Sequence, residues 1–168
     1  TDSFIAAVIA AFAAGALSGL IYALLTVTFM ANQNVTGLTL TIFGIGLANF
    51  IGYYCVAKAP EGTLKLPEHV MNVMAMNPFV YLGIAAAVAL HFYYYHTNVG
   101  LSVRAIGENP ASADAAGVNV TRLKFINIVI GGGICGIGGA YTLMITNGGV
   151  WINDCVGGLG WIAVALVI

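Results

Sequence analysis

A run of glycines is the first pattern in this chain whose spacing suggests chemistry. Gly131-Gly132-Gly133-Ile134-Cys135-Gly136 formally satisfies G-x-G-x-x-G, and Asp154 follows at about the distance of a carboxylate that binds a ribose. A dinucleotide site also needs a strand before the glycines and a helix after them. Here the glycines lie inside an apolar stretch long enough to cross a membrane, so close helix packing is the favoured interpretation.

A pair of histidines is the next candidate for a ligand site. His91 and His96 are five positions apart, so they do not share a helix face as ligands at i and i+4 would. Tyr93 to Tyr95 lie between them, and such rings commonly sit at the headgroup level of a membrane. We therefore expect interface residues here and no metal or haem.

Cysteine and phosphate-binding patterns point to no cofactor either. Cys55, Cys135 and Cys155 are odd in number and widely separated, which fits neither a disulfide framework nor a zinc site. The chain has no G-x-x-x-x-G-K-[ST] sequence, so it has no Walker-type loop for ATP. We expect no cofactor and no enzymatic activity, and any dependence on ATP must come from a partner.

Composition shows what kind of element must position these residues. Hydrophobic residues make up 60% of the chain and charged residues only 7%, a balance that suits lipid surroundings rather than water. No charged residue occurs between Asp2 and Lys58, which leaves room for two spans of about 20 residues. The net charge of -1 suggests no nucleic acid as a partner.

The fold class predicted from these stretches is an all-α, polytopic transmembrane helical bundle that forms one domain over residues 1–168. It has four complete spans and the start of a fifth, at about 3–29, 36–54, 79–95, 125–146 and 158–168. The chain opens on Thr1, and its last uncharged stretch is too short to cross about 30 Å of hydrocarbon. We therefore expect a fragment of a longer protein.

Small residues predict where the spans pack. Gly15 and Gly19 have the small-xxx-small spacing that lets two helices approach closely in lipid, and Gly132 and Gly136 repeat it in the fourth span. The fourth span must be tightly surrounded or broken, because it carries further glycines.

The loops give the orientation. The loop at 97–124 carries Arg104, Arg122 and Lys124, against Lys58 and Lys65 in the loop before the third span. The positive-inside rule then favours the cytoplasm for loop 97–124 and for the turn at 32–34, with the N-terminal end outside. Near Pro67 and Glu68 we expect a short interfacial helix.

Within loop 97–124, a short helix has both of its ends encoded in the sequence. Asn109 can cap it, Pro110 fits its first position, and Gly117 can adopt the left-handed conformation after its last turn. Its alanines form a smooth ridge suited to a groove on another protein. A linker helix that touches nothing is the alternative.

Four polar residues are candidates for a solute pathway. Asp154 is the only acid beyond the fourth span, and acids near hydrocarbon are often functional. With Asn147 and Asn153 it could line the outer mouth of a pathway, or be an ordinary loop acid in headgroup water. Asn49 in the second span is a further candidate, although one amide can simply bond a neighbouring helix.

The loop also carries a resemblance to a known family. The run GLSVRAIGENP at 100–110, continued by ADAAGVNV at 113–120, resembles the coupling loop of ABC importer permeases of the branched-chain amino acid, ribose and nucleoside class. The match is closest to simple-sugar and nucleoside permeases that work with Bmp-type binding lipoproteins. Residues 31–40, 138–141 and 158–168 agree as well, but Leu159 stands where many relatives have a basic residue.

The resemblance implies a permease subunit of an ATP-driven importer for a nucleoside or simple sugar, in the bacterial cytoplasmic membrane. The implied partners are a separate ATP-binding subunit, a second permease subunit that is identical or homologous, and an extracytoplasmic substrate-binding protein. The loop residues implied to contact the ATP-binding subunit are Gly107, Glu108, Asn109, Pro110, Ala111, Ser112, Ala113, Asp114, Ala115, Ala116 and Gly117.

Two other functions stay open at this point. A gradient-driven secondary transporter would use ionisable residues in mid-membrane, which the predicted spans lack. A non-transporting membrane anchor of a redox or assembly complex would give His91 and His96 a role.

Overall fold

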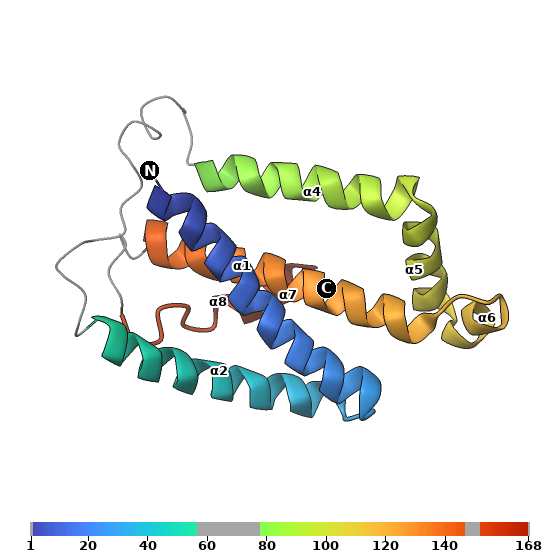
Figure 1. Ribbon diagram of the computed structural model, residues 1–168, viewed down its shortest axis with the longest axis horizontal. Coiled ribbons are helices and arrows are strands. Elements are labelled where there is room, and N and C mark those ends of the chain that lie inside the picture. The colour runs from blue at the N-terminus through green and yellow to red at the C-terminus, as the bar shows by residue number, and fades with distance from the viewer. Residues whose placement is uncertain (1, 57–77, 147–151, 168) are drawn as a thin grey trace.

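The computed structural model describes residues 2–56, 78–146 and 152–167, and in these ranges all regular secondary structure is helical (Figure 1). The predicted interfacial helix near Pro67 lies outside the described residues. The elements are α1 (Asp2–Ala23), the π-helical turn η1 (Leu24–Thr28), α2 (Gln33–Val56), α4 (Pro78–His96), α5 (Asn98–Glu108), α6 (Pro110–Ala115), α7 (Val120–Tyr141), the π-helical turn η2 (Thr142–Thr146) and α8 (Leu159–Val167).

Three helices of the described ranges are long and apolar enough to cross a membrane, namely Ile5–Thr28, Gln33–Tyr54 and Val120–Thr146. They coincide with the first, second and fourth predicted spans. The third predicted span is the 19-residue helix α4, and the fifth begins as α8. Many large apolar side chains, such as Leu17, Phe43 and Phe92, are exposed, as expected for helices surrounded by lipid or by other subunits.

The core of the bundle is the crossing of α1 and α7 (Figure 1). A Cβ added to Gly132 would lie 2.7 Å from the backbone oxygen of Gly15 and 3.0 Å from Cα of Gly19, and one added to Gly136 would lie 3.0 Å from Cα of Gly15. The two backbones therefore touch directly, which only residues without side chains permit. The predicted fourth span is unbroken through its glycines up to Tyr141.

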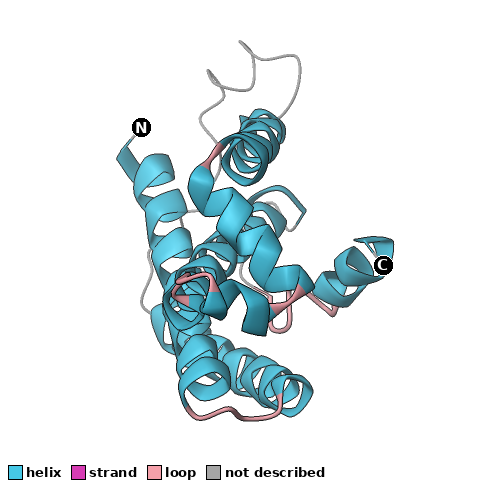
Figure 2. Cartoon of the chain, turned by 90° about the vertical axis from the view of Figure 1, so that its right-hand side faces the viewer, coloured by secondary structure: helices cyan, strands magenta, loops and turns pink. Residues whose placement is uncertain are grey.

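Helix α4 runs alongside α7 in the opposite direction. Near its start, the rings of Phe79 and Tyr141 lie 5.6 Å apart, and near its end the hydroxyl of Tyr94 donates a 3.4 Å hydrogen bond to Oδ1 of Asn127. The turn between η1 and α2 lies at the same end of the bundle as α5 and α6 (Figure 1). Helix α8 lies on the side away from α1 (Figure 2).

The prediction of a loop over 97–124 needs correction, because most of that stretch is helical. Helix α5 begins after Thr97, whose hydroxyl oxygen accepts a 3.0 Å hydrogen bond from the amide of Gly100, and Ile106 is buried. The backbone turns sharply between α4 and α5, where a Cβ on Gly100 would lie 2.5 Å from the backbone oxygen of Tyr94. Helix α7 then starts at Val120, five residues before the predicted span.

Candidate functional site

Both ends of α6 have the predicted cap geometry. Oδ1 of Asn109 accepts hydrogen bonds from the amides of Ala111 and Ser112 at 3.1 and 3.2 Å, and Pro110 occupies the first turn. Gly117 has φ +84°, and its amide bonds the carbonyl of Asp114 at 2.9 Å. These contacts fix the length and direction of a helix that would be marginal in isolation.

The alanines of α6 do not all face outward. Ala113 is 3% exposed, and its carbonyl accepts a 3.1 Å hydrogen bond from the amide of Val118, which folds the chain back towards α7. The expectation that all the alanines contact a partner is therefore wrong for Ala113, whose methyl group packs inside the chain. Ala111, Ala115 and Ala116 are exposed and form the available ridge.

Charged groups surround α6 on the elements that hold it. Glu108 ends α5, and Asp114 is exposed on α6 itself. The guanidinium carbon of Arg104 lies 4.8 Å from the ring centre of Tyr95, so this cation rests on the end of α4. Arg122 and Lys124 in the first turns of α7 are exposed. The end of the bundle that carries α6 thus presents several charges to water.

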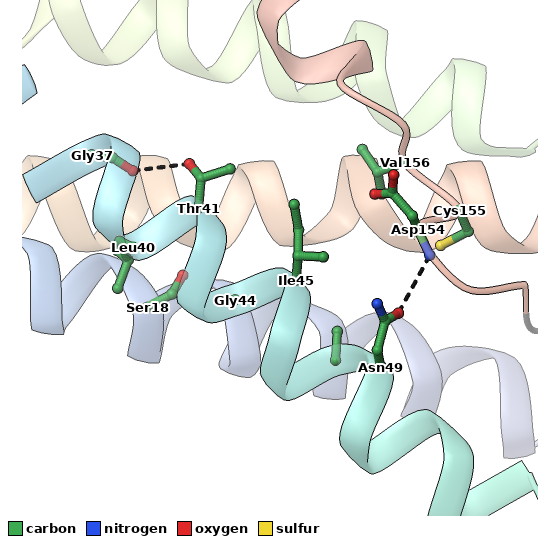
Figure 3. A pocket seen from close by; sticks show the side chains of 11 residues that line it. Ser18, Gly37, Leu40, Thr41, Gly44, Ile45, Asn49, Asp154, Cys155 and Val156 are labelled. Atoms are coloured by element: carbon green, nitrogen blue, oxygen red, sulfur yellow. Dashed lines mark hydrogen bonds between the residues drawn. The ribbon is translucent and has the colours of Figure 1, made fainter. Parts of the chain in front are cut away.

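A cavity of about 400 Å³ lies farther along α2, between α1, α2 and the segment at 154–156 (Figure 3). Two of the predicted pathway residues meet here. Oδ1 of the half-buried Asn49 accepts a 3.3 Å hydrogen bond from the backbone amide of Asp154, across 105 positions of sequence. Asp154 has φ +56°, a left-handed conformation in which Asp is one of the few tolerated residue types.

The other predicted pathway residues are not part of this cavity. Asn153 is exposed beside it, and Asn147 lies outside the described residues. The structure adds Ser18, Thr41 and Cys155, which sequence reasoning missed. A signal did exist, because Thr41 and Asn49 are eight positions apart and therefore share one face of α2.

The four predicted packing glycines, Gly15, Gly19, Gly132 and Gly136, all meet at the α1–α7 crossing.

The ring of His91 stacks on Tyr95 at 4.8 Å, and that of His96 stacks on Phe92 at 4.7 Å. Within the described ranges, no three His, Cys, Asp or Glu side chains come together as metal ligands would.

Comparison with known proteins gives a consistent result. Residues 1–168 match the family described as branched-chain amino acid transport system / permease component. Similar proteins include TsgC13 of Haloferax volcanii, a permease protein named for a glucose ABC transporter, which is 32% identical over 93% of this chain and 51% of its own length. The guanosine ABC transporter permease protein NupQ of Bacillus subtilis is 29% identical over 95% of this chain and 54% of its own length.

A third relative is the nucleoside ABC transporter permease protein NupC of Lactococcus lactis subsp. cremoris, 26% identical over 92% of this chain and 52% of its own length. The chain thus spans about half the length of the curated relatives it matches. No solved structure matches significantly. Apolar spans, a glycine-packed helical bundle and a family match over the whole chain agree, and this membrane protein belongs to the permease component family of branched-chain amino acid-type transport systems.

Proposed function

We propose that this chain is part of the permease subunit of an ABC importer that moves a nucleoside or a simple sugar across the bacterial cytoplasmic membrane. The family and the names of three relatives, which refer to glucose, guanosine and nucleosides, support this proposal. ATP hydrolysis takes place on a separate subunit, since the chain has no Walker-type loop.

The observation that carries the proposal is the position of α6. It is capped at both ends, it exposes an alanine ridge, and only four residues separate it from α7. Helix α7 in turn packs backbone to backbone on α1. A push on α6 by an ATP-binding subunit therefore moves the α1–α7 pair as a unit, which is the kind of two-state change that alternates access between the two sides.

The remaining partners follow from the same proposal. A second permease subunit, identical or homologous, completes the pathway across the exposed apolar faces. An extracytoplasmic binding protein delivers the solute at the end of the bundle opposite α6.

Co-purification tests this proposal. The full-length protein is purified from native membranes in mild detergent, as wild type, as Ala116→Arg and as Ala105→Arg. Ala105 is an exposed alanine of α5, so its variant adds the same bulk and charge outside the ridge. We expect an ATP-binding subunit to co-purify with the wild type and with Ala105→Arg, and to be lost from Ala116→Arg.

Uptake of labelled uridine and glucose into cells, measured for the same three proteins, gives the functional readout. ATP-dependent uptake that is lost with Ala116→Arg supports the coupling role of α6. If the folded protein retains no ATPase, or if its uptake follows an ion gradient instead, the importer proposal is wrong.

A further inference from the structure

We propose that the cavity between α1, α2 and residues 154–156 is a water-filled solute site, in which the carboxylate of Asp154 accepts hydrogen bonds from neighbouring hydroxyl groups of a neutral, polyhydroxylated ring. This inference rests on the proposed function and adds to it a binding site and its selectivity. Ribose in nucleosides and the rings of simple sugars share this hydroxyl chemistry.

The depth of the cavity in the membrane is the first argument. Asn49 lies about 24 Å along α2 from Gln33, inside a helix that meets the length of a membrane span. The backbone amide of Asp154 is hydrogen-bonded to it, so the non-helical residues 154–156 lie beside this span. Irregular backbone at membrane depth persists only where protein buries it or where it lines a water-filled space.

The backbone of this segment is built to turn. Asp154, Gly157 and Gly158 all have positive φ angles, of 56°, 48° and 80°, and the amide of Gly157 bonds the carbonyl of Asp154 at 3.0 Å. The turn leaves the main chain of Asp154 tied to Asn49, and Figure 3 shows its carboxylate extending away from that bond, towards Val156.

The polar groups of the lining keep hydrogen-bond acceptor capacity for a solute. The hydroxyls of Ser18 and Thr41 donate to the carbonyls of Gly15 and Gly37 in their own helices, at 2.8 and 2.9 Å, so their oxygens can still accept. The side-chain carboxylate of Asp154 makes no hydrogen bond or ion pair with any residue that the structure describes.

Charge sets the selectivity. The cations of the described ranges, Arg104, Arg122 and Lys124, lie on α5 and in the first turns of α7, at the far end of the bundle (Figure 1). No described cation therefore balances the carboxylate of Asp154, and solutes with a phosphate or carboxylate group are repelled. Two oxygens of one carboxylate can instead accept from two adjacent hydroxyls, and about 400 Å³ suits a small-molecule site.

The chain supplies its own probe, because Cys155 lines the cavity. The full-length protein is studied in right-side-out membrane vesicles with Cys55→Ser and Cys135→Ser, so that Cys155 remains as the thiol of this chain. Its rate of modification is measured with a cationic trimethylammonium-ethyl and an anionic sulfonato-ethyl methanethiosulfonate. A matched protein keeps Cys135 instead, a thiol outside this cavity.

We expect both reagents to modify Cys155. The ratio of the cationic to the anionic rate should be higher than the ratio measured for a free thiol in solution. Uridine and glucose slow the modification of Cys155, whereas uridine 5′-monophosphate does not. None of these three solutes changes the modification rate of Cys135. Asp154→Asn removes the preference for the cation and raises the half-protecting uridine concentration at least about tenfold, because a hydrogen bond to a charged group is lost. Asn tolerates the same left-handed backbone, so this variant keeps the turn.

Unreactive Cys155, or protection by uridine that is unchanged in Asp154→Asn, would overturn the solute site. ATP-driven uptake is measured separately, in intact cells that produce the same proteins. If uptake is absent while protection by uridine and its dependence on Asp154 persist, the importer mechanism fails and the solute site stands.

Discussion

At the scale of single residues, the α1–α7 crossing depends on glycines, which have no Cβ atom to keep the two backbones apart. Gly132 can be tested by the smallest possible change, because a Cβ there would lie 2.7 Å from the backbone oxygen of Gly15. Backbone cannot move aside as a flexible side chain can, so Gly132→Ala should lower the free energy of unfolding by about 1–3 kcal/mol. Thermal unfolding of the purified protein in detergent measures this as a lower midpoint.

The neighbouring Gly131 is the matched control, since a Cβ there would meet nothing within 4 Å. Gly131→Ala makes the same chemical change one position away. Like Gly132→Ala, it replaces a helical glycine by alanine, which by itself favours the helix. Its midpoint should stay level or rise. Equal midpoints for the two variants would show that the two backbones do not touch at this crossing.

At the scale of elements, α6 depends on the cap at Asn109. Asn109→Ala removes the acceptor for two amides, which costs about 0.5–2 kcal/mol in comparable helices. Amide hydrogen exchange over residues 111–116 should accelerate roughly fivefold, as a local loss of about 1 kcal/mol implies. Asn98→Ala on α5 is the control, because that side chain makes no hydrogen bond within the described ranges.

If exchange is equally fast in both variants, the cap does not hold α6. If it accelerates only in Asn109→Ala, uptake in the same variant measures how far transport depends on the order of α6.

The elements also show what the sequence could and could not predict. The span helices and the caps of α6 follow from local signals, apolar length and cap residues, that act within one segment. Helix α5 was missed because its polar surface resembles a loop, although Thr97 before it was a usable cap signal. The small-xxx-small spacing identified Gly15 and Gly132 separately, but only the packed bundle shows that they face each other.

The cavity was harder to predict for the same reason. Asn49 and Asp154 were each suspected from their polarity near apolar stretches. Their contact spans 105 positions and depends on how the segment at 152–158 folds back against α2. No local sequence pattern encodes a contact between segments so far apart in the chain. Ser18 and Cys155 have no distinctive sequence context, so only the folded structure shows that they line the cavity.

At the scale of the whole molecule, the two proposed roles belong to different parts of the bundle. The end with the η1–α2 turn carries α5, α6 and the exposed cations of α7 (Figure 1). The cavity lies along the middle of α2, where its lining runs from Gly37 to Asn49. The glycine crossing of α1 and α7 connects α6 and the cavity rigidly, because packed backbones move together rather than deform.

We predict that α4 also crosses the membrane. Its contacts tie Phe79 to Tyr141 and Tyr94 to Asn127, so it follows α7 over most of its length, and α7 is long and apolar enough to span. Its 19 residues reach about 28 Å, close to the hydrocarbon thickness of about 30 Å. Because α2 leads away from the η1–α2 turn and α4 leads back, we expect residues 34 and 98 to lie on the same side of the membrane.

Single cysteines in a background with Ser at 55, 135 and 155 test this topology. We expect Asn34→Cys and Asn98→Cys to resist a membrane-impermeant thiol reagent in intact cells and to react after lysis. Both lie at the end of the bundle that carries the cations of α5 and α7, which the positive-inside rule predicts to face the cytoplasm. Asn153→Cys, exposed near the cavity, should react in intact cells. Labelling of Asn98→Cys but not Asn34→Cys in intact cells would mean that α4 does not cross, and the reverse pattern at all three positions would invert the orientation and place α6 outside, where no ATP-binding subunit could reach it.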